Sequence, residues 1–288
     1  MNSATATRFA PLLFVLLWST GFIGAKYGLP HAEPLSFLLV RYLLVLSLMT
    51  LIALATRAPW PKDGRQWFHI GVAGLLVHAV YLGGVFIAIS KGLPAGVTSL
   101  VVGIQPLLTA FGAGWLLGEK VSGRQWGGLA LGFVGVGLVV SGKLGDGALG
   151  PMLIPALIAL LGITVGTLYQ KRFCAKFDLR TGSVIQFVPT AVLTAIAVAL
   201  YEDYKIEWTG QFAFALGWLV LVLSIGAISL LNLLIRSGSA VNVASLFYLT
   251  PLSTALIAWV IFGEKLTLTA AFGMLLAVSG VYLVARAK

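Results

Sequence analysis

Two cations placed inside long apolar runs are the first residues that could do chemistry. Trp18, Phe22 and Lys26 are spaced four residues apart, so on a helix they share one face, and Arg41 lies in the next run. A basic side chain within a membrane costs roughly 2.5–3.5 kcal/mol on insertion scales, so it usually faces a cavity or a partner. We expect Lys26 and Arg41 to form a cationic wall for a carboxylate or phosphate. The alternatives are that Lys26 extends to the lipid headgroups and that Arg41 pairs with Glu33.

Other polar and aromatic side chains lie in later apolar runs and could line the same cavity. His78, followed by Tyr81 one turn on, could accept a coupling proton, because the ordinary pKa of a histidine lies near neutral pH, although a lone buried histidine can also be a packed core residue. Trp18 could stack on a substrate, or it could pack in the core or anchor at the membrane interface. The remaining candidates for substrate contact are Gln105, Tyr169, Asn232, Asn242, Ser245 and Thr250.

Two prolines interrupt apolar runs at equivalent places. Pro106 follows Gln105, and Pro251 follows Thr250. Each proline removes one backbone N–H and frees a carbonyl one turn back. The freed carbonyls could hold a substrate ammonium group or a water, or the prolines could serve only as packing kinks. We expect helix breaks at both.

These candidates lie in a chain of 288 residues that is 59% hydrophobic and only 10% charged. This composition, arranged in long apolar runs, predicts an all-α membrane protein. Its mean hydropathy is +1.00. A soluble domain is about 25% charged, so a soluble enzyme or a disordered chain is excluded. A spanning helix needs about 20 apolar residues. We expect ten spans, at about 9–29, 34–56, 66–90, 94–118, 122–141, 151–171, 181–200, 212–235, 239–262 and 267–285.

The charge distribution predicts the orientation. The net charge is +10, but the basic residues lie in short gaps between apolar runs, which favours anionic lipid rather than nucleic acid as the partner. Lys and Arg gather in the gaps on the same side as the termini, so we expect both termini in the cytoplasm. Cys174 is the single cysteine, so an intrachain disulfide is excluded. We expect neither a metal nor a cofactor, and either a monomer or a homodimer.

The sequence repeats itself after 145 residues. Pro106-Leu107 recurs as Pro251-Leu252, and Gly118-Glu119-Lys120 recurs as Gly263-Glu264-Lys265. We therefore expect two units, 1–145 and 146–288, with five spans each. Because five is odd, the second unit enters the membrane from the opposite side, which gives an inverted repeat suited to alternating access. A stripe of small residues also recurs: Gly128, Gly132 and Gly135 correspond to Gly273, Ala277 and Gly280.

The ten spans, the Trp18-Ser19-Thr20-Gly21 segment and the paired Pro…Gly-Glu-Lys motifs resemble the EamA-type branch of the drug/metabolite transporter superfamily. The resemblance covers nearly the whole chain and implies a ten-helix carrier of the inner membrane that exports amino acids or other small metabolites. We expect a secondary transporter, not an enzyme, with a small carboxylate-bearing substrate. The alternatives are export of lipophilic cations, a passive pore, and a lipid-handling protein.

Overall fold

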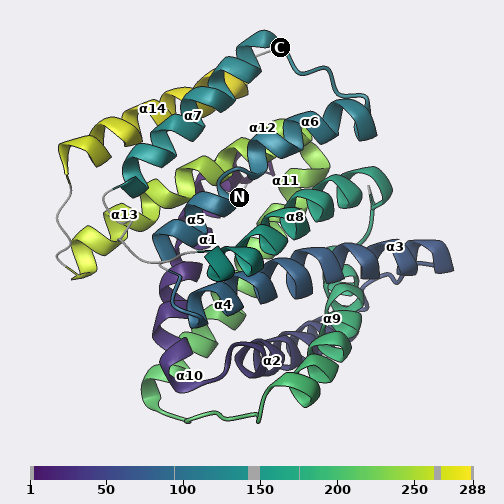
Figure 1. Ribbon diagram of the computed structural model, residues 1–288. Helices are drawn as coiled ribbons and strands as arrows, with labels where there is room; N and C mark the ends of the chain where they lie inside the picture. The colour runs from purple at the N-terminus through teal and green to yellow at the C-terminus, as the bar shows by residue number, and fades with distance from the viewer. Residues whose placement is uncertain (1–2, 94, 142–149, 175, 263–266, 287–288) are drawn as a thin grey trace.

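In the computed structural model, the described residues are 3–93, 95–141, 150–174, 176–262 and 267–286, and their elements are helices joined by loops (Figure 1). Within these ranges the extended pairing is limited to a bridge between Ala32 and Ile206. The helices are α1 (Ser3–Gly28), α2 (Pro34–Ala55), α3 (Gly64–Gly74), α4 (Tyr81–Ser90), α5 (Ala95–Val102), α6 (Gln105–Leu117), α7 (Gly123–Ser141), α8 (Gly150–Phe173), α9 (Leu179–Tyr201), α10 (Gly210–Trp218), α11 (Ile228–Ser237), α12 (Ala240–Ser245), α13 (Leu249–Phe262) and α14 (Leu268–Arg286).

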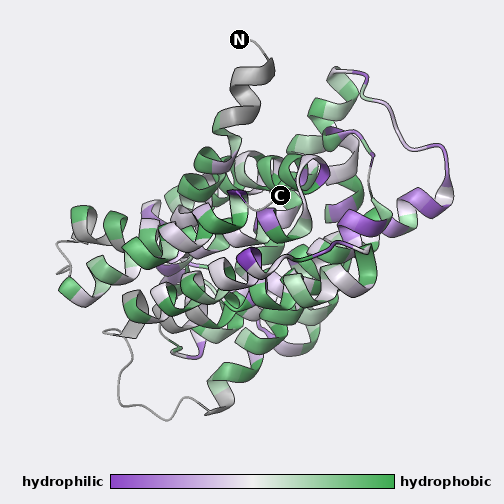
Figure 2. Cartoon of the chain, turned by 90° about the horizontal axis from the view of Figure 1, so that it is seen from above, coloured by the Kyte–Doolittle hydropathy of each residue, from purple (hydrophilic) through white to green (hydrophobic). Residues whose placement is uncertain are grey.

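Seven stretches of the described chain are long and apolar enough to cross a membrane. The helices in Figure 2 carry mostly the colour of hydrophobic residues, and large apolar side chains such as Trp115 are exposed, in this case by 90%. Many exposed apolar side chains on long helices suit a surface that contacts lipid. The seven stretches are Phe9–His31, Pro34–Ala55, Gly64–Ser90, Met152–Phe173, Leu179–Tyr201, Gly210–Ser237 and Leu268–Arg286.

Two of the other expected spans are divided into shorter helices. The run 94–118 contains a turn at Gly103 and Ile104 that separates α5 from α6, and Pro106 lies in the first turn of α6. The run 239–262 contains a 3₁₀ segment, η4 (Leu246–Tyr248), between α12 and α13. The structure thus gives seven candidate spans among the described residues, and the expected number of ten spans stays a prediction. The Gly263-Glu264-Lys265 motif and the boundary at 145–146 lie outside the described residues.

Two long helices contain π-helical segments at equivalent places. The segment η2 (Leu75–Val80) joins α3 to α4, and η3 (Leu219–Ala227) joins α10 to α11. A shift of 145 residues carries the first segment into the second. π-Helical segments of this kind occur frequently at functional sites.

Helices α2 and α9, which correspond under the same shift, pack against each other in opposite directions. Glu202, after the end of α9, accepts hydrogen bonds from the backbone N–H groups of Leu35 (2.8 Å) and Ser36 (2.7 Å) at the start of α2. At the other end, the Thr181 hydroxyl at the start of α9 donates to the carbonyl of Pro59, beyond the end of α2 (2.9 Å). The pair is therefore antiparallel.

Helices α7 and α14 also correspond under the shift and lie side by side (Figure 1). The stripe of small residues forms their interface: a methyl group added at Gly128 would lie 2.7 Å from the carbonyl oxygen of Gly280, and one at Gly135 would lie 2.5 Å from that of Gly273. As the residue number rises along α7 it falls along α14, so these helices are antiparallel too. The small residues permit this close backbone approach within one chain.

The loop between α1 and α2 is held against the loop between α9 and α10. Glu33 Oε2 accepts hydrogen bonds from the backbone N–H groups of Asp203 (3.1 Å) and Lys205 (3.0 Å). The Lys205 ammonium donates to Asp203 Oδ2 at 2.5 Å and holds the pKa of that carboxyl below its usual range. Glu33 is thus engaged in the loops rather than with Arg41.

Replacing Glu202 with alanine should destabilise the protein by about 1–2 kcal/mol, the usual cost of losing a helix cap that also interacts with the helix dipole. Its carboxylate accepts three hydrogen bonds, from Leu35 N, Ser36 N and Ser36 Oγ (2.7 Å). The measurement is the apparent melting temperature of the purified protein in detergent. The matched control is Glu207→Ala: this side chain is 77% exposed and reaches His31 Nδ1 only at 3.5 Å. Equal losses in both variants would contradict the capping role.

Candidate functional site

A pocket lies among α1, α2, α4, η3 and α11, and the space inside it, open solvent included, is about 450 Å³. Most of its wall is aliphatic or aromatic, and a single cationic side chain, that of Arg41, is among the described lining residues. Those residues are Trp18, Gly21, Ala25, Arg41, Tyr81, Leu82, Val85, Phe86, Leu223 and Ile228.

Arg41 is 3% exposed, and its Nε donates a hydrogen bond to the Ser224 hydroxyl of η3 (2.9 Å). Within the described residues no carboxylate lies within ion-pair distance of its guanidinium group, and Glu33 is engaged with Asp203 and Lys205. A buried, unneutralised cation is costly, and a guanidinium group binds carboxylates and phosphates with two parallel hydrogen bonds. The cavity therefore has the chemistry of an anion site with apolar walls.

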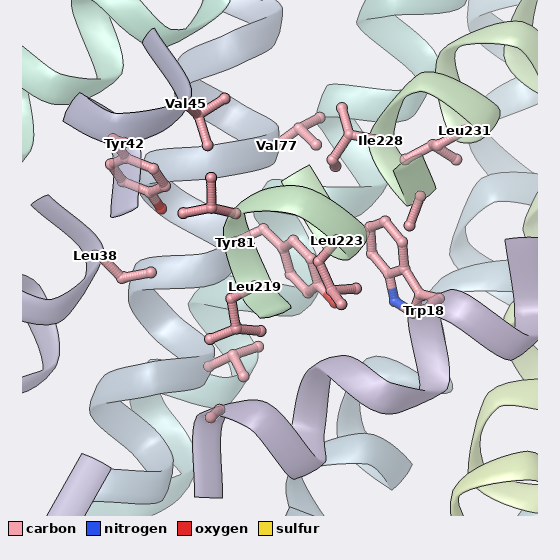
Figure 3. Close-up of a cluster of buried hydrophobic side chains, with 14 of the residues drawn as sticks. Trp18, Leu38, Tyr42, Val45, Val77, Tyr81, Leu219, Leu223, Ile228 and Leu231 are labelled. Atoms are coloured by element: carbon pink, nitrogen blue, oxygen red, sulfur yellow. The ribbon is translucent and has the colours of Figure 1, made fainter. Parts of the chain in front are cut away.

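Two aromatic rings separate this cavity from a second one. Trp18 and Tyr81 stack with their centroids 6.1 Å apart and their planes 9° apart; they lie beside Leu223 (Figure 3). Both rings also line a pocket with an empty volume of about 240 Å³ that reaches Gly103 and Pro251. The second pocket therefore lies against both helix interruptions, with the aromatic pair as the wall between the two spaces.

The structure places some of the expected site residues at these two pockets. Trp18, Arg41 and Tyr81 line the first, and Thr250 and Pro251 line the second. Gln105 and Pro106 are buried at the start of α6. Ser245 is buried at the end of α12, where its hydroxyl donates to the carbonyl of Asn242.

Other expected site residues lie elsewhere. Lys26 is exposed near the end of α1 and is not among the residues that line either pocket. The Tyr169 hydroxyl lies 2.6 Å from His69 Nδ1, and the Asn242 amide lies 3.5 Å from that of Gln125. His78 and Asn232 are buried in a separate polar cluster. The side chain of Phe22 lies outside the described residues.

The sequence interpretation missed three polar residues that the structure brings into prominence: Ser224, Gln170 and Gln186. Ser224 holds Arg41, and the two glutamines form hydrogen bonds within the buried cluster. Gln186 had a signal in the sequence, because the 145-residue shift that relates the two units pairs it with Arg41. Ser224 had none, since a serine in an apolar run is common on any face of a helix.

The fold defines the class of protein: it is a multi-pass helical membrane protein with internal, largely apolar pockets. The chain belongs to the EamA-like transporter family, which matches residues 8–141 and again residues 150–286. The two matches correspond to two repeats of the family unit.

Similar proteins agree with this membership. The chain is 30% identical to the "Uncharacterized transporter YvbV" of Bacillus subtilis, over 99% of this chain and 93% of that protein. It is 27% identical to a "Probable amino-acid metabolite efflux pump" of Escherichia coli, over 94% and 92% of the two chains. It is also 27% identical to the "Uncharacterized inner membrane transporter YedA" of Escherichia coli, over 88% and 81%. A solved crystal structure with 22% identity shares the fold, with a TM-score of 0.78 over 97% of this chain and 96% of the other.

Proposed function

We propose that the protein is a secondary transporter that exports an amino acid or a related small carboxylate-bearing metabolite by alternating access. The observation that carries the proposal is the buried Arg41 guanidinium on the wall of an apolar cavity, with no carboxylate near it among the described residues. A substrate carboxylate would supply the missing charge. The printed name of the Escherichia coli efflux pump, a relative at 27% identity, supports the same substrate class.

The proposed architecture is ten spans in two inverted five-helix units, residues 1–145 and 146–288, with both termini in the cytoplasm. The antiparallel packing of α2 with α9, and of α7 with α14, supports the inversion, because each pair consists of corresponding helices. Inverted units of similar energy can exchange conformations and so exchange which face of the membrane is open. The helix interruptions near Pro106 and Pro251 would supply polar backbone to this path, and Gly103, Thr250 and Pro251 line the second pocket.

A second candidate function is efflux of lipophilic cations or other apolar drugs. The aromatic side chains Trp18, Tyr81 and Phe86 on the cavity wall favour it. The positive charge of Arg41 opposes it, because a cationic drug would be repelled in a space where water does not screen the interaction.

Counterflow in proteoliposomes tests the proposal. Radiolabelled amino acids and organic acids are offered to vesicles loaded with the same unlabelled compound, and each acid is paired with its amide, in which an uncharged group replaces the carboxylate. We expect saturable accumulation of at least one acid and little of its amide. Accumulation of no acid would overturn the substrate proposal. Dye resistance that persists in an Arg41→Leu variant would favour the drug carrier, and a leak without saturation or counterflow would indicate a pore.

A further inference from the structure

A buried chain of polar side chains lies close to Arg41 but outside the lining of the Arg41 cavity. Gln186 of α9 donates through Nε2 to Gln170 Oε1 of α8 (3.2 Å), and Gln170 donates through Nε2 to Asn232 Oδ1 of α11 (2.8 Å). His78 of η2 lies beside Gln186 and stacks on Phe187 at a centroid distance of 4.3 Å. These four polar side chains are each at most 2% exposed, and we call them the amide cluster: His78, Gln170, Gln186 and Asn232.

The amide cluster is incompletely satisfied in this conformation. The Nδ2 of Asn232 makes no hydrogen bond, and His78 and the Oε1 of Gln186, although the two residues lie in contact, do not reach standard hydrogen-bond geometry. A buried polar atom without a partner costs about 1–3 kcal/mol. Asn and Gln side chains often join membrane helices by hydrogen bonds, as Gln170 does here, whereas an ionisable residue such as His78 usually faces a water-filled space or a functional path. The atoms without partners are what packing in this conformation leaves unexplained.

The internal repeat shows what the cluster corresponds to. The 145-residue shift pairs Gln186 with Arg41, Gln170 with Ala25, and His78 with Leu223. Arg41, Ala25 and Leu223 all line the Arg41 cavity. Three members of the amide cluster, Gln170 and Gln186 in the second unit and His78 in the first, thus occupy positions that the shift relates to lining residues of the Arg41 cavity.

The contacts around the two places obey the same correspondence. A methyl group added at Gly21 of α1 would lie 3.2 Å from Leu223 of η3, and one added at the corresponding Gly166 of α8 would lie 2.7 Å from Val77 of η2. Helix α1 therefore packs on η3 as α8 packs on η2. Arg41 is the eighth residue of the 22-residue α2 and Gln186 is the eighth of the 23-residue α9; because these helices are antiparallel, the two residues lie on opposite sides of the middle of the pair.

We propose that the amide cluster is the second polar site of the transport path, closed in this structure, which opens to the opposite face of the membrane when the Arg41 cavity closes. This inference rests on the proposed function. When open, the cluster offers amide and imidazole groups, which bind water and the uncharged polar groups of a substrate. It offers no cation for a carboxylate, so the substrate would be held by charge at Arg41 and by weaker, uncharged hydrogen bonds at the cluster.

Cysteine labelling from the two faces of the membrane tests the inference. The natural Cys174 is first replaced by serine, and single cysteines are introduced at the paired positions as Ala25→Cys and Gln170→Cys. Ala227→Cys, the counterpart of the cavity residue Leu82, is a milder second reporter of the cluster side. The control is Leu129→Cys, in the packed core near α14. An impermeant methanethiosulfonate is added to spheroplasts and, separately, to inverted membrane vesicles.

We expect Ala25→Cys to react from one face and Gln170→Cys and Ala227→Cys to react from the other. Each should react at least about tenfold faster than Leu129→Cys, because an open transport state is populated far more often than global unfolding. The inference would be overturned if all three cysteines reacted from the same face. It would also be overturned if both cluster reporters, Gln170→Cys and Ala227→Cys, reacted no faster than the control. The labelling requires no transported solute. Opposite-face labelling without any counterflow would therefore contradict the substrate proposal and leave this inference standing.

Discussion

An Arg41→Leu variant should lose counterflow of carboxylate-bearing solutes while remaining folded. Truncating one partner of a buried charged pair costs about 2–5 kcal/mol, which corresponds to a roughly 30-fold or greater loss of affinity. The fold should survive, because the described partner of the Arg41 side chain is the neutral hydroxyl of Ser224, so the change leaves no opposite charge unpaired. Arg41→Lys keeps the charge but not the two-pronged geometry, so it should fall between the wild type and leucine.

The measurement is the initial rate of counterflow against substrate concentration, with size-exclusion chromatography as the check on folding. Lys26→Leu is the matched control, because this cation is exposed and is not among the cavity-lining residues. We expect it to change the apparent affinity little. Full counterflow by Arg41→Leu, or an equal loss in Lys26→Leu, would show that the cavity around Arg41 is not the carboxylate site.

Adding a single methyl group in the α7–α14 interface should strongly destabilise the protein. In Gly128→Ala, the new methyl group would lie 2.7 Å from the carbonyl oxygen of Gly280 and 3.0 Å from Leu283 Cβ. Real side chains do not approach backbone so closely, so α7 and α14 must separate. Overpacking of this kind costs about 1–3 kcal/mol, and more where backbone atoms must move.

The adjacent glycine provides a matched control for this effect. At Gly127 a methyl group would meet nothing within 4 Å, and alanine favours a helix over glycine by about 1 kcal/mol. Thermal unfolding in detergent should therefore show a lower apparent melting temperature for Gly128→Ala and an unchanged or higher one for Gly127→Ala. The same shift in both variants would contradict the close contact between the two helices.

The sequence was sufficient to predict the helical membrane class and the repeat, because both depend on long-range features: apolar run length and motifs that recur in register. It also singled out Arg41, since a cation inside an apolar run is rare whatever the fold. It was not sufficient to separate Arg41 from Lys26. α2 is apolar on all sides, so its sequence does not show which face meets the cavity; packing against η3 decides this.

The interruptions of the helices were only partly predictable. Pro106 and Pro251 marked the neighbourhood of the breaks, but the turn at Gly103 and Ile104 precedes the first proline. The π-helical segments η2 and η3 had no recognised signal, because their composition is that of any apolar helix. The orientation of His78 toward Gln186 and Phe187 depends on one such segment and so could not be predicted either.

The hydrogen bonds at both ends of the α2–α9 pair have a mechanical consequence. Glu202 joins one end and Thr181 the other, so we expect the two helices to move together as one unit. Arg41 and Gln186 both belong to this pair. Under the proposed alternating access, the movement that exposes one of them should therefore come from the surrounding helices, α1 against η3 and α8 against η2.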